Sequence, residues 1–233
     1  MLNKFAIVPE HFILATKAFK PQTHLLEPED LAATYACIQT YAHDPAAGEL
    51  FAFFNSGEHS GASQAHRHIQ LLPIASMESG IKAEDEGKWK VLVDDLAGAP
   101  FATFSASIHP RMSPDELHAV YMSLYRKGCA AIAASTNSTL PEVDPAGQTT
   151  FSYNLGFTKN TLALLPRVTE GAAITTPEGR DVGKLALNGT VLAGTALVKN
   201  EAEWDTLRAN PEMVSNLLKA IGLPNTSTAS PKI

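Results

Sequence analysis

The sequence lacks the features that mark secreted and membrane-spanning proteins. It has only two cysteines in 233 residues, too few for a disulfide framework, and we interpret Cys37 and Cys129 as small buried residues of a reduced protein. No apolar run approaches the roughly 20 residues that span a bilayer. The short apolar stretch at the start, which ends at Pro9, is unlike a signal peptide. We therefore expect a cytoplasmic location, with the nucleus as the alternative.

Clusters of basic residues are missing as well. The chain has 18 lysines and arginines against 24 aspartates and glutamates, which gives a net charge of −6. A nucleic-acid-binding protein needs a concentrated positive surface, so we predict no nucleic-acid partner and no membrane partner. The acidic balance does not exclude a small polyanionic ligand, because backbone N–H groups and Ser, Asn and Gln side chains bind phosphate.

Hydrophobic residues make up 45% of the chain, enough for a sizeable core in one large or two small domains. The predicted strands and helices do not alternate regularly, which favours an antiparallel α+β fold over a doubly wound one. The predicted strands are 5–8, 12–16, 50–55, 66–72, 101–108, 151–157, 161–165 and 190–199. The predicted helices are 28–42, one that begins after the capping residue Ser113, 204–208 and 211–221.

The most informative segment is 55–70. Alternate residues of a strand share a face, so His66, His68 and Gln70 are expected to form a polar row on one side of the sheet. The loop before them contains glycines, which allow the backbone to approach a ligand closely. Its neutral hydrogen-bond donors are Ser60, Ser63 and Gln64.

This row of imidazole and amide groups suits nucleophilic attack on phosphorus. Neutral imidazole is a nucleophile at physiological pH, because its pKa is about 6.5, and its other ring nitrogen is expected to donate to a fixed carbonyl. His68 would then form a covalent nucleotidyl intermediate that splits one displacement into two. Gln70 can donate a hydrogen bond to a phosphate oxygen but cannot deliver a proton. The leaving group and the acceptor should therefore both be anionic phosphates, which favours a transferase over a hydrolase.

Two other interpretations of the histidines compete with this one. Two histidines on one strand face can bind zinc, but no cysteine pair or carboxylate lies at metal-ligand spacing nearby, and His59 is the only further candidate. A purely structural role for His66 and His68 fits poorly with the glycine-bearing loop before them. We predict no metal held by the protein. The remaining histidines, at 11, 24, 43, 109 and 118, are interpreted as surface or structural residues.

With these residues in hand, the chain resembles the fungal diadenosine tetraphosphate phosphorylases, also called ATP adenylyltransferases, of the histidine-triad superfamily. The resemblance rests first on Gly-Ala-Ser-Gln-x-His-x-His-x-Gln over 61–70. It extends to the segments 3–12, 100–101, 152–155, 165–167 and 187–199, and covers nearly the whole chain up to about Leu223. It implies a histidine-triad-like antiparallel sheet with flanking helices. The implied division is a catalytic part over 1–94, a C-terminal adenylyltransferase part over 95–224 and a disordered tail over 225–233.

The resemblance also implies a reaction and a set of site residues. His68 would become adenylylated while diadenosine tetraphosphate is converted by phosphate into ATP and ADP, and His66 and Gln70 would complete the catalytic set. A divalent cation such as Mg²⁺ would be bound through the substrate phosphates. The implied substrate-binding residues are Asn55, Gly61, Ala62, Ser63, Gln64, Gln70, Asn188, Gly189, Thr190, Thr195 and Lys199. Without the resemblance, Asn188 and Gly189 would be interpreted as a tight turn and Lys199 as a solvated strand end.

Two features depart from the family pattern. Relatives normally carry a substantial segment, including a nucleotide-binding lysine, before the part that begins here at Met1, and its absence would leave a sheet edge unpaired. Thr195 stands where relatives often have methionine.

The alternatives to this assignment differ in chemistry. A histidine-triad hydrolase would usually have a third histidine where Gln70 stands. A hexose-1-phosphate uridylyltransferase would usually have proline where Arg67 stands. An inactive nucleotide-binding remnant is the alternative outside enzymes. We expect a monomer.

Overall fold

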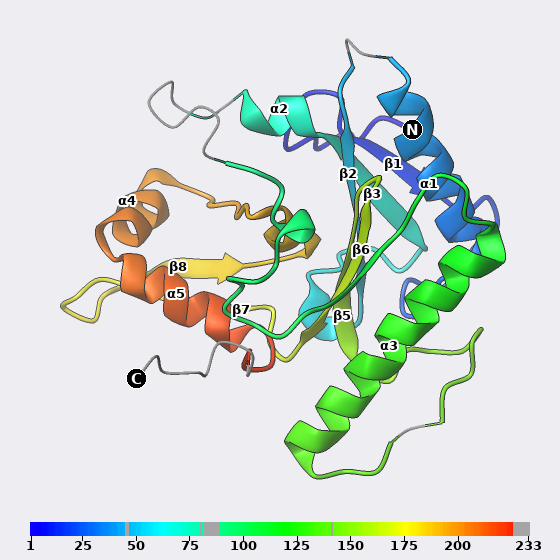
Figure 1. Ribbon diagram of the computed structural model, residues 1–233. Helices are drawn as coiled ribbons and strands as arrows, with labels where there is room; N and C mark the ends of the chain where they lie inside the picture. The colour runs from blue at the N-terminus through cyan, green and yellow to red at the C-terminus, as the bar shows by residue number, and fades with distance from the viewer. Residues whose placement is uncertain (45–46, 80, 82–88, 141, 226–233) are drawn as a thin grey trace, which may run out of the picture.

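The structure is a computed structural model that describes residues 1–44, 47–79, 81, 89–140 and 142–225. Its centre is an antiparallel sheet of six strands in the order β1-β3-β2-β5-β6-β4 (Figure 1). The strands are β1 (Phe12–Ala15), β2 (Leu50–Ser56), β3 (His68–Pro73), β4 (Phe104–Ser107), β5 (Ser152–Phe157) and β6 (Thr161–Arg167). The predicted α+β class with an antiparallel sheet is confirmed.

Both predicted parts of the chain contribute to this one sheet. Strands β1 to β3 come from the part predicted at 1–94 and β4 to β6 from the part predicted at 95–224, and the two meet where β2 pairs with β5. Strand β3 lies between β1 and β2, so that Ile13 and Phe53 both lie opposite Gln70. The boundary itself stays a prediction, and of the predicted tail only Asn225 lies within the described residues.

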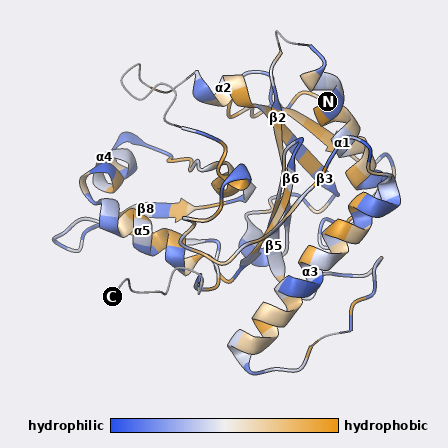
Figure 2. Cartoon of the chain, viewed as in Figure 1, coloured by the Kyte–Doolittle hydropathy of each residue, from blue (hydrophilic) through white to orange (hydrophobic). Residues whose placement is uncertain are grey.

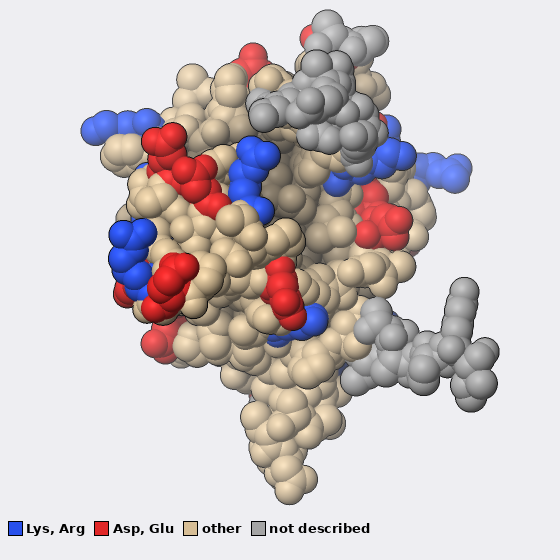
Figure 3. Space-filling view, turned by 90° about the vertical axis from the view of Figure 1, so that its left-hand side faces the viewer, with Lys and Arg blue, Asp and Glu red and all other residues tan. Residues whose placement is uncertain are grey.

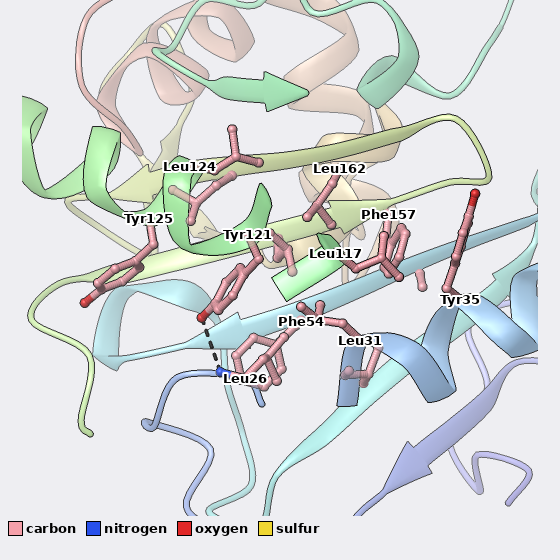
Figure 4. Packing of buried hydrophobic residues seen from close by; sticks show 14 of the residues in the cluster. Leu26, Leu31, Tyr35, Phe54, Leu117, Tyr121, Leu124, Tyr125, Phe157 and Leu162 are labelled. Atoms are coloured by element: carbon pink, nitrogen blue, oxygen red, sulfur yellow. Dashed lines mark hydrogen bonds between the residues drawn. The ribbon is translucent and has the colours of Figure 1, made fainter. Parts of the chain in front are cut away.

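Two helices, α1 (Pro28–Ala42) and α3 (Pro114–Thr136), cover one face of the sheet. Their buried side chains pack against those of the central strands (Figure 4). The residues labelled there include Leu31 and Tyr35 of α1, Leu117, Tyr121, Leu124 and Tyr125 of α3, and Phe54, Phe157 and Leu162 of the sheet. The buried Tyr121 hydroxyl oxygen accepts the Leu26 N–H at 3.3 Å, so this polar atom is satisfied inside the core.

The C-terminal segment covers the opposite face. It contains the two-stranded sheet β7 (Gly171–Thr175) and β8 (Asp181–Ala186), the 3₁₀ helix η4 (Gly189–Ala193), and the helices α4 (Glu201–Ala209) and α5 (Pro211–Ala220). Phe51 and Phe53 of β2 and Leu192 of η4 belong to the core cluster on this side. Gln70 is the register partner of Phe53, so its side chain projects from this same face.

The predicted long helix and its starting residue are confirmed. Ser113 Oγ accepts the Glu116 N–H at 3.3 Å, and the Glu116 carboxylate accepts the Ser113 N–H at 2.7 Å, which completes a capping box. Along α3, hydrophilic and hydrophobic residues alternate (Figure 2), as expected for a helix with one face against the sheet. None of the helices in the described part of the chain combines the length and hydrophobicity needed to cross a bilayer.

The remaining short elements connect this framework. They are the 3₁₀ helices η1 (Glu58–Ser60) and η3 (Leu92–Asp94) and the helix α2 (Ile74–Glu78). The predicted hairpin of β5 and β6 is confirmed, and the predicted helices near the C-terminus are found as α4 and α5.

The predicted strand at residues 5–8 is wrong. The Asn3 N–H donates to the His11 carbonyl at 2.9 Å, and the His11 N–H donates to the Val8 carbonyl at 3.3 Å. These bonds close residues 3–11 into a compact loop before β1. Within this loop Ile7 and Val8 pack against the core cluster that contains Phe51, whereas Phe5 is 78% exposed.

The predicted strand at 190–199 is also wrong, and β7 and β8 were not predicted. The segment after Asn188 forms η4, where Asn188 Oδ1 accepts the Thr190 N–H at 3.0 Å and starts the turn. A short apolar run fits a buried helical turn as well as a strand, and here the side-chain cap decides between them.

Candidate functional site

His68 is the first residue of β3 and is half-buried, whereas its neighbours Arg67 and Ile69 are buried. Its ring Nδ1 lies 2.9 Å from the carbonyl oxygen of His66. A carbonyl oxygen can only accept a hydrogen bond, so Nδ1 carries the proton and Nε2 keeps a free lone pair. The carbonyl partner expected for the second ring nitrogen is therefore present, and Nε2 is the nitrogen available for attack.

The predicted strand begins two residues too early, since His66 lies outside β3. The Arg67 N–H donates to the Lys20 carbonyl at 2.7 Å, so at this point the chain pairs with the loop that follows β1. The His66 ring Nε2 lies 2.9 Å from Thr16 Oγ1 in that loop. His66 therefore contacts His68 through its main-chain carbonyl, while its ring is held by the loop.

Gln70 is half-buried on the same face as Phe53 and is hydrogen-bonded to His11, a histidine predicted to be a surface or structural residue. Burial lowers the pKa of the His11 imidazole, and a hydrogen bond with the Gln70 side chain partly opposes that shift. The His11 ring also lies 3.3 Å from Asn3 Nδ2, and its Nδ1 accepts the Ile7 N–H at 3.4 Å. The role of Gln70 as a donor to a ligand stays a prediction.

A chain of buried polar groups holds the side chain of Asn55. Asn55 Oδ1 accepts hydrogen bonds from Asn154 Nδ2 and from the Gly189 N–H, both at 2.8 Å. Asn154 Nδ2 also donates to the Ser60 carbonyl at 2.8 Å, and Asn154 Oδ1 accepts from the Arg167 guanidinium. Because Asn55 Oδ1 already has two donors, Asn55 Nδ2 is the atom left to donate to a substrate.

Arg167 is a buried cation, only 2% exposed, behind this chain of amides. Its other donors reach main-chain carbonyls of Thr169, Glu170, Leu187 and Ile221. Burial lowers the pKa of Arg167 to about 10, against the opposing charge of the Glu170 carboxylate, so the guanidinium stays protonated at neutral pH. Its hydrogen-bond partners are neutral oxygens, so they leave its positive charge available to favour an anionic ligand near Asn55.

The glycine-bearing loop packs closely against the start of η4. Gly61 has a φ of +77°, and a Cβ there would lie 2.7 Å from Asn188 Cβ. A Cβ on Gly189 would lie 2.7 Å from Phe53 Cδ2 and 2.8 Å from Asn55 Oδ1. Glycine is required at both positions because any side chain would push the two segments apart. The structure thus brings together four residues predicted for the site: Asn55, Gly61, Asn188 and Gly189.

Three further predicted residues, Ala62, Ser63 and Gln64, continue the loop toward β3. The Ala62 N–H donates to Ser60 Oγ at 3.3 Å, which ties the loop to η1. The side chains of Ser63 and Gln64 are exposed. Both can therefore meet a ligand that lies over the loop, and their roles stay predictions.

The last three predicted residues lie in or after η4. The Thr190 carbonyl accepts from the Thr195 N–H at 3.2 Å and from Thr195 Oγ1 at 3.1 Å, so these two threonines form one turn. Lys199 is exposed, and its N–H donates to the Glu203 carboxylate at 2.8 Å just before α4. The contacts of the described residues do not bring the Lys199 side chain to the amides around Asn55.

A cavity of about 630 Å³ lies beside β4 and α3, and His68 is not among its lining residues. A cavity of about 300 Å³ touches His68 and is bordered by Lys17, Lys20 and Arg67. Figure 3 shows acidic and basic side chains interspersed around a recess rather than gathered by sign. Within the described part of the chain, no group of three His, Cys, Asp or Glu residues could hold a metal ion.

The fold and the site together define an antiparallel α+β protein in which one histidine lies near buried, hydrogen-bonded amide groups. Comparison with family models identifies the family to which the chain belongs. The model described as Ap4A phosphorylase N-terminal domain matches residues 1–84, and the model described as ATP adenylyltransferase C-terminal domain matches residues 97–224. The chain therefore belongs to the Ap4A phosphorylase (ATP adenylyltransferase) family, and the resemblance noted from the sequence is confirmed.

Individual relatives agree with this family. The chain is 30% identical to diadenosine 5′,5‴-P1,P4-tetraphosphate phosphorylase 2 of Saccharomyces cerevisiae over 249 residues, which cover 99% of this chain and 71% of the relative. It is 28% identical to Protein APA1 of the same yeast, over 99% of this chain and 70% of the relative.

Among solved structures, yeast Ap4A phosphorylase Apa2 matches with a TM-score of 0.74 and 29% identity, over 99% of this chain and 73% of that chain. Its complex with Ap4A matches with a TM-score of 0.72 and 27% identity, over 97% of this chain and 73% of that chain. The sheet described above is therefore the fold of this family.

Proposed function

We propose that this chain is a diadenosine tetraphosphate phosphorylase, which transfers AMP from diadenosine tetraphosphate to phosphate, yields ATP and ADP, and runs in reverse as an ATP adenylyltransferase. The observation that carries the proposal is the His68 ring, whose Nδ1–H is held by a carbonyl while Nε2 stays free. Family membership supports the substrate, because a yeast relative that matches 99% of this chain is named diadenosine tetraphosphate phosphorylase.

The proposed reaction has two displacements at one phosphorus. In the first, the His68 Nε2 lone pair attacks the phosphorus next to adenosine, an N–P bond forms, and the P–O bond to the rest of the substrate breaks with its electron pair. ATP leaves as an anion and needs no proton. In the second, an oxygen of inorganic phosphate attacks the same phosphorus, the N–P bond breaks, and ADP is released. Nδ1 keeps its proton throughout.

Neutral donors would stabilise the charge on the transferring phosphoryl group. Asn55 Nδ2, on β2, and the side-chain amide of Gln70, on the same strand as His68, would be these donors. The Asn55 amide is fixed through its oxygen, so it needs little reorganisation when charge builds up in the transition state. Arg167 adds a buried positive charge behind Asn55.

A divalent cation such as Mg²⁺ fits this site only through the substrate. The cavity beside His68 is lined by the carboxylates of Glu29 and Asp30 as well as by basic side chains, but the described residues contain no group of three His, Cys, Asp or Glu that could hold a metal ion. Phosphate oxygens of the substrate would hold the ion, which would offset part of the polyphosphate charge. We expect chelation by EDTA to raise KM for diadenosine tetraphosphate without changing the unfolding temperature of the free protein.

The proposal is tested with diadenosine tetraphosphate labelled on the phosphates next to adenosine. Wild-type protein without phosphate should retain acid-labile label, and added phosphate should release it as labelled ADP. His68→Ala should retain none. Label released as AMP without phosphate would instead indicate a hydrolase, and nucleotide binding without any label would indicate an inactive remnant. The monomeric state and the cytoplasmic location stay predictions. Analytical ultracentrifugation would measure the oligomeric state.

A further inference from the structure

Gln22 lies in the loop between β1 and α1, outside the predicted site, yet its buried side chain reaches the main chain of two site residues. Gln22 Oε1 accepts the His68 N–H at 2.7 Å. Gln22 Nε2 donates to the Asn55 carbonyl at 2.8 Å and to the His68 carbonyl at 3.2 Å. The side chain is 2% exposed, so one amide links the proposed nucleophile to the neighbouring strand without reaching solvent.

These contacts replace a pair of main-chain hydrogen bonds that would otherwise join β2 and β3. The two strands pair regularly from Leu50–Pro73 to Phe53–Gln70. The same register, continued by two residues, would place Asn55 opposite His68, where direct N–H to carbonyl bonds are expected. Here the connection runs from the His68 N–H to Gln22 Oε1 and from Gln22 Nε2 to the Asn55 carbonyl. An inserted amide holds the strands farther apart than the roughly 4.8 Å of a regular ladder.

The main chain of Gln22 is itself fixed at this point. Its N–H donates to the Ala65 carbonyl at 2.8 Å, and its carbonyl accepts from Ser56 Oγ at 3.1 Å. The amide is therefore anchored at both ends, to the loop before β3 and to the end of β2. An anchored amide can define a distance, whereas a mobile one could not.

We propose that Gln22 is a positioning residue for phosphoryl transfer, which sets the separation between Asn55 and His68 and so the width of the gap in which the phosphoryl group next to adenosine is attacked. The inference rests on the proposed function. It assigns Gln22 no contact with substrate. Since rate depends steeply on the placement of the nucleophile, a change in this separation should lower the rate of the chemical step more than it weakens substrate binding.

The chemistry of the gap calls for an amide. The group between the strands must accept one hydrogen bond and donate at least one. A Met side chain of similar length does neither. An ionised Glu accepts but cannot donate, whereas a protonated Glu can do both, through its carbonyl and its O–H. A Glu buried among carbonyl oxygens has a raised pKa, so it takes up its proton as the pH falls toward and through neutrality.

The first test compares Gln22→Met with Gln39→Met, a matched amide-to-thioether control. Gln39 donates to the Pro110 carbonyl from α1, on the other face of the sheet. The measurement is the single-turnover rate of protein labelling by diadenosine tetraphosphate, at a temperature where circular dichroism shows folded protein. We expect Gln22→Met to label roughly tenfold to a hundredfold more slowly at saturating substrate, with half-saturation within about threefold of wild type, and Gln39→Met to match wild type.

The second test uses Gln22→Glu, and it tests the positioning role of Gln22 even if Gln22→Met fails to fold. The ratio of its labelling rate to the wild-type rate should rise as the pH is lowered from 8.5 to 6, because the protonated carboxyl restores both hydrogen bonds. A folded Gln22→Met at the wild-type rate, or a Gln22→Glu ratio that does not change with pH, would overturn the inference. Wild-type protein that takes up no label would instead refute the proposed function.

Discussion

Asn154 connects the buried Arg167 to the Asn55 side chain, so two substitutions at Asn154 should separate stability from activity. Asn154→Ala removes an acceptor for the Arg167 guanidinium and two donors, to Asn55 Oδ1 and to the Ser60 carbonyl, from a fully buried position. A hydrogen bond from a charged group contributes about 1.5–3 kcal/mol and a neutral one about 1 kcal/mol. The sum predicts a loss of about 4 kcal/mol in the free energy of unfolding.

Asn154→Asp should behave differently because a carboxylate keeps the acceptor and adds an ion pair with Arg167. It loses both donors, so Asn55 Oδ1 keeps only the Gly189 N–H and faces a negative oxygen. We expect a loss of about 2 kcal/mol in stability together with a fall of more than tenfold in kcat/KM, since Asn55 no longer has a fixed orientation.

The assay is urea unfolding followed by tryptophan fluorescence, alongside steady-state phosphorolysis. The control is Asn216→Ala on the exposed face of α5, which should change stability by less than about 0.5 kcal/mol. Equal destabilisation by the two Asn154 variants, or wild-type activity in Asn154→Asp, would refute the reasoning.

Three further predictions concern stability and the packing of the site. Ser113→Ala removes the α3 cap and should cost about 1 kcal/mol in urea unfolding with activity unchanged; no loss would contradict the capping box. Burial lowers the pKa of His11 in the folded protein. Below about pH 6.5, therefore, the unfolded chain binds a proton at this histidine more readily than the folded protein does. Stability should fall from that pH downward, and His11→Asn should flatten the dependence; an unchanged slope would be inconsistent. Gly189→Ala should reduce both stability, by about 1–3 kcal/mol, and phosphorolysis, because its Cβ would meet Phe53 and Asn55, whereas Gly98→Ala, in open space, should do neither.

Local signals in the sequence were sufficient for the elements that local interactions determine. The capping box at Ser113 and the hairpin that turns at Lys159 and Asn160 depend on residues close in sequence, and both were predicted. The stretch 190–199 was misassigned because its apolar residues suit a strand, whereas the Asn188 side chain starts a 3₁₀ turn there. Propensity and periodicity carry no information about such a cap when the run is short.

Sequence patterns alone identified site residues only where these lie together in one short segment. Alternation along 66–70 identified His68 and Gln70, and the family pattern supplied Asn188 and Gly189, which the structure places against Asn55 and Gly61. The residues that orient these groups could not be found in the same way. Gln22, His11 and Arg167 act through tertiary hydrogen bonds to partners far away in the sequence, and as single residues they look like ordinary loop, surface and strand positions.

The most direct test of the covalent step is the stereochemistry at phosphorus. Diadenosine tetraphosphate made chiral at the phosphorus next to adenosine would be converted with phosphate, and the configuration of the ADP product determined. Two successive in-line displacements through His68 predict overall retention of configuration. Inversion would mean that phosphate attacks the substrate directly, and it would contradict a covalent intermediate on this histidine.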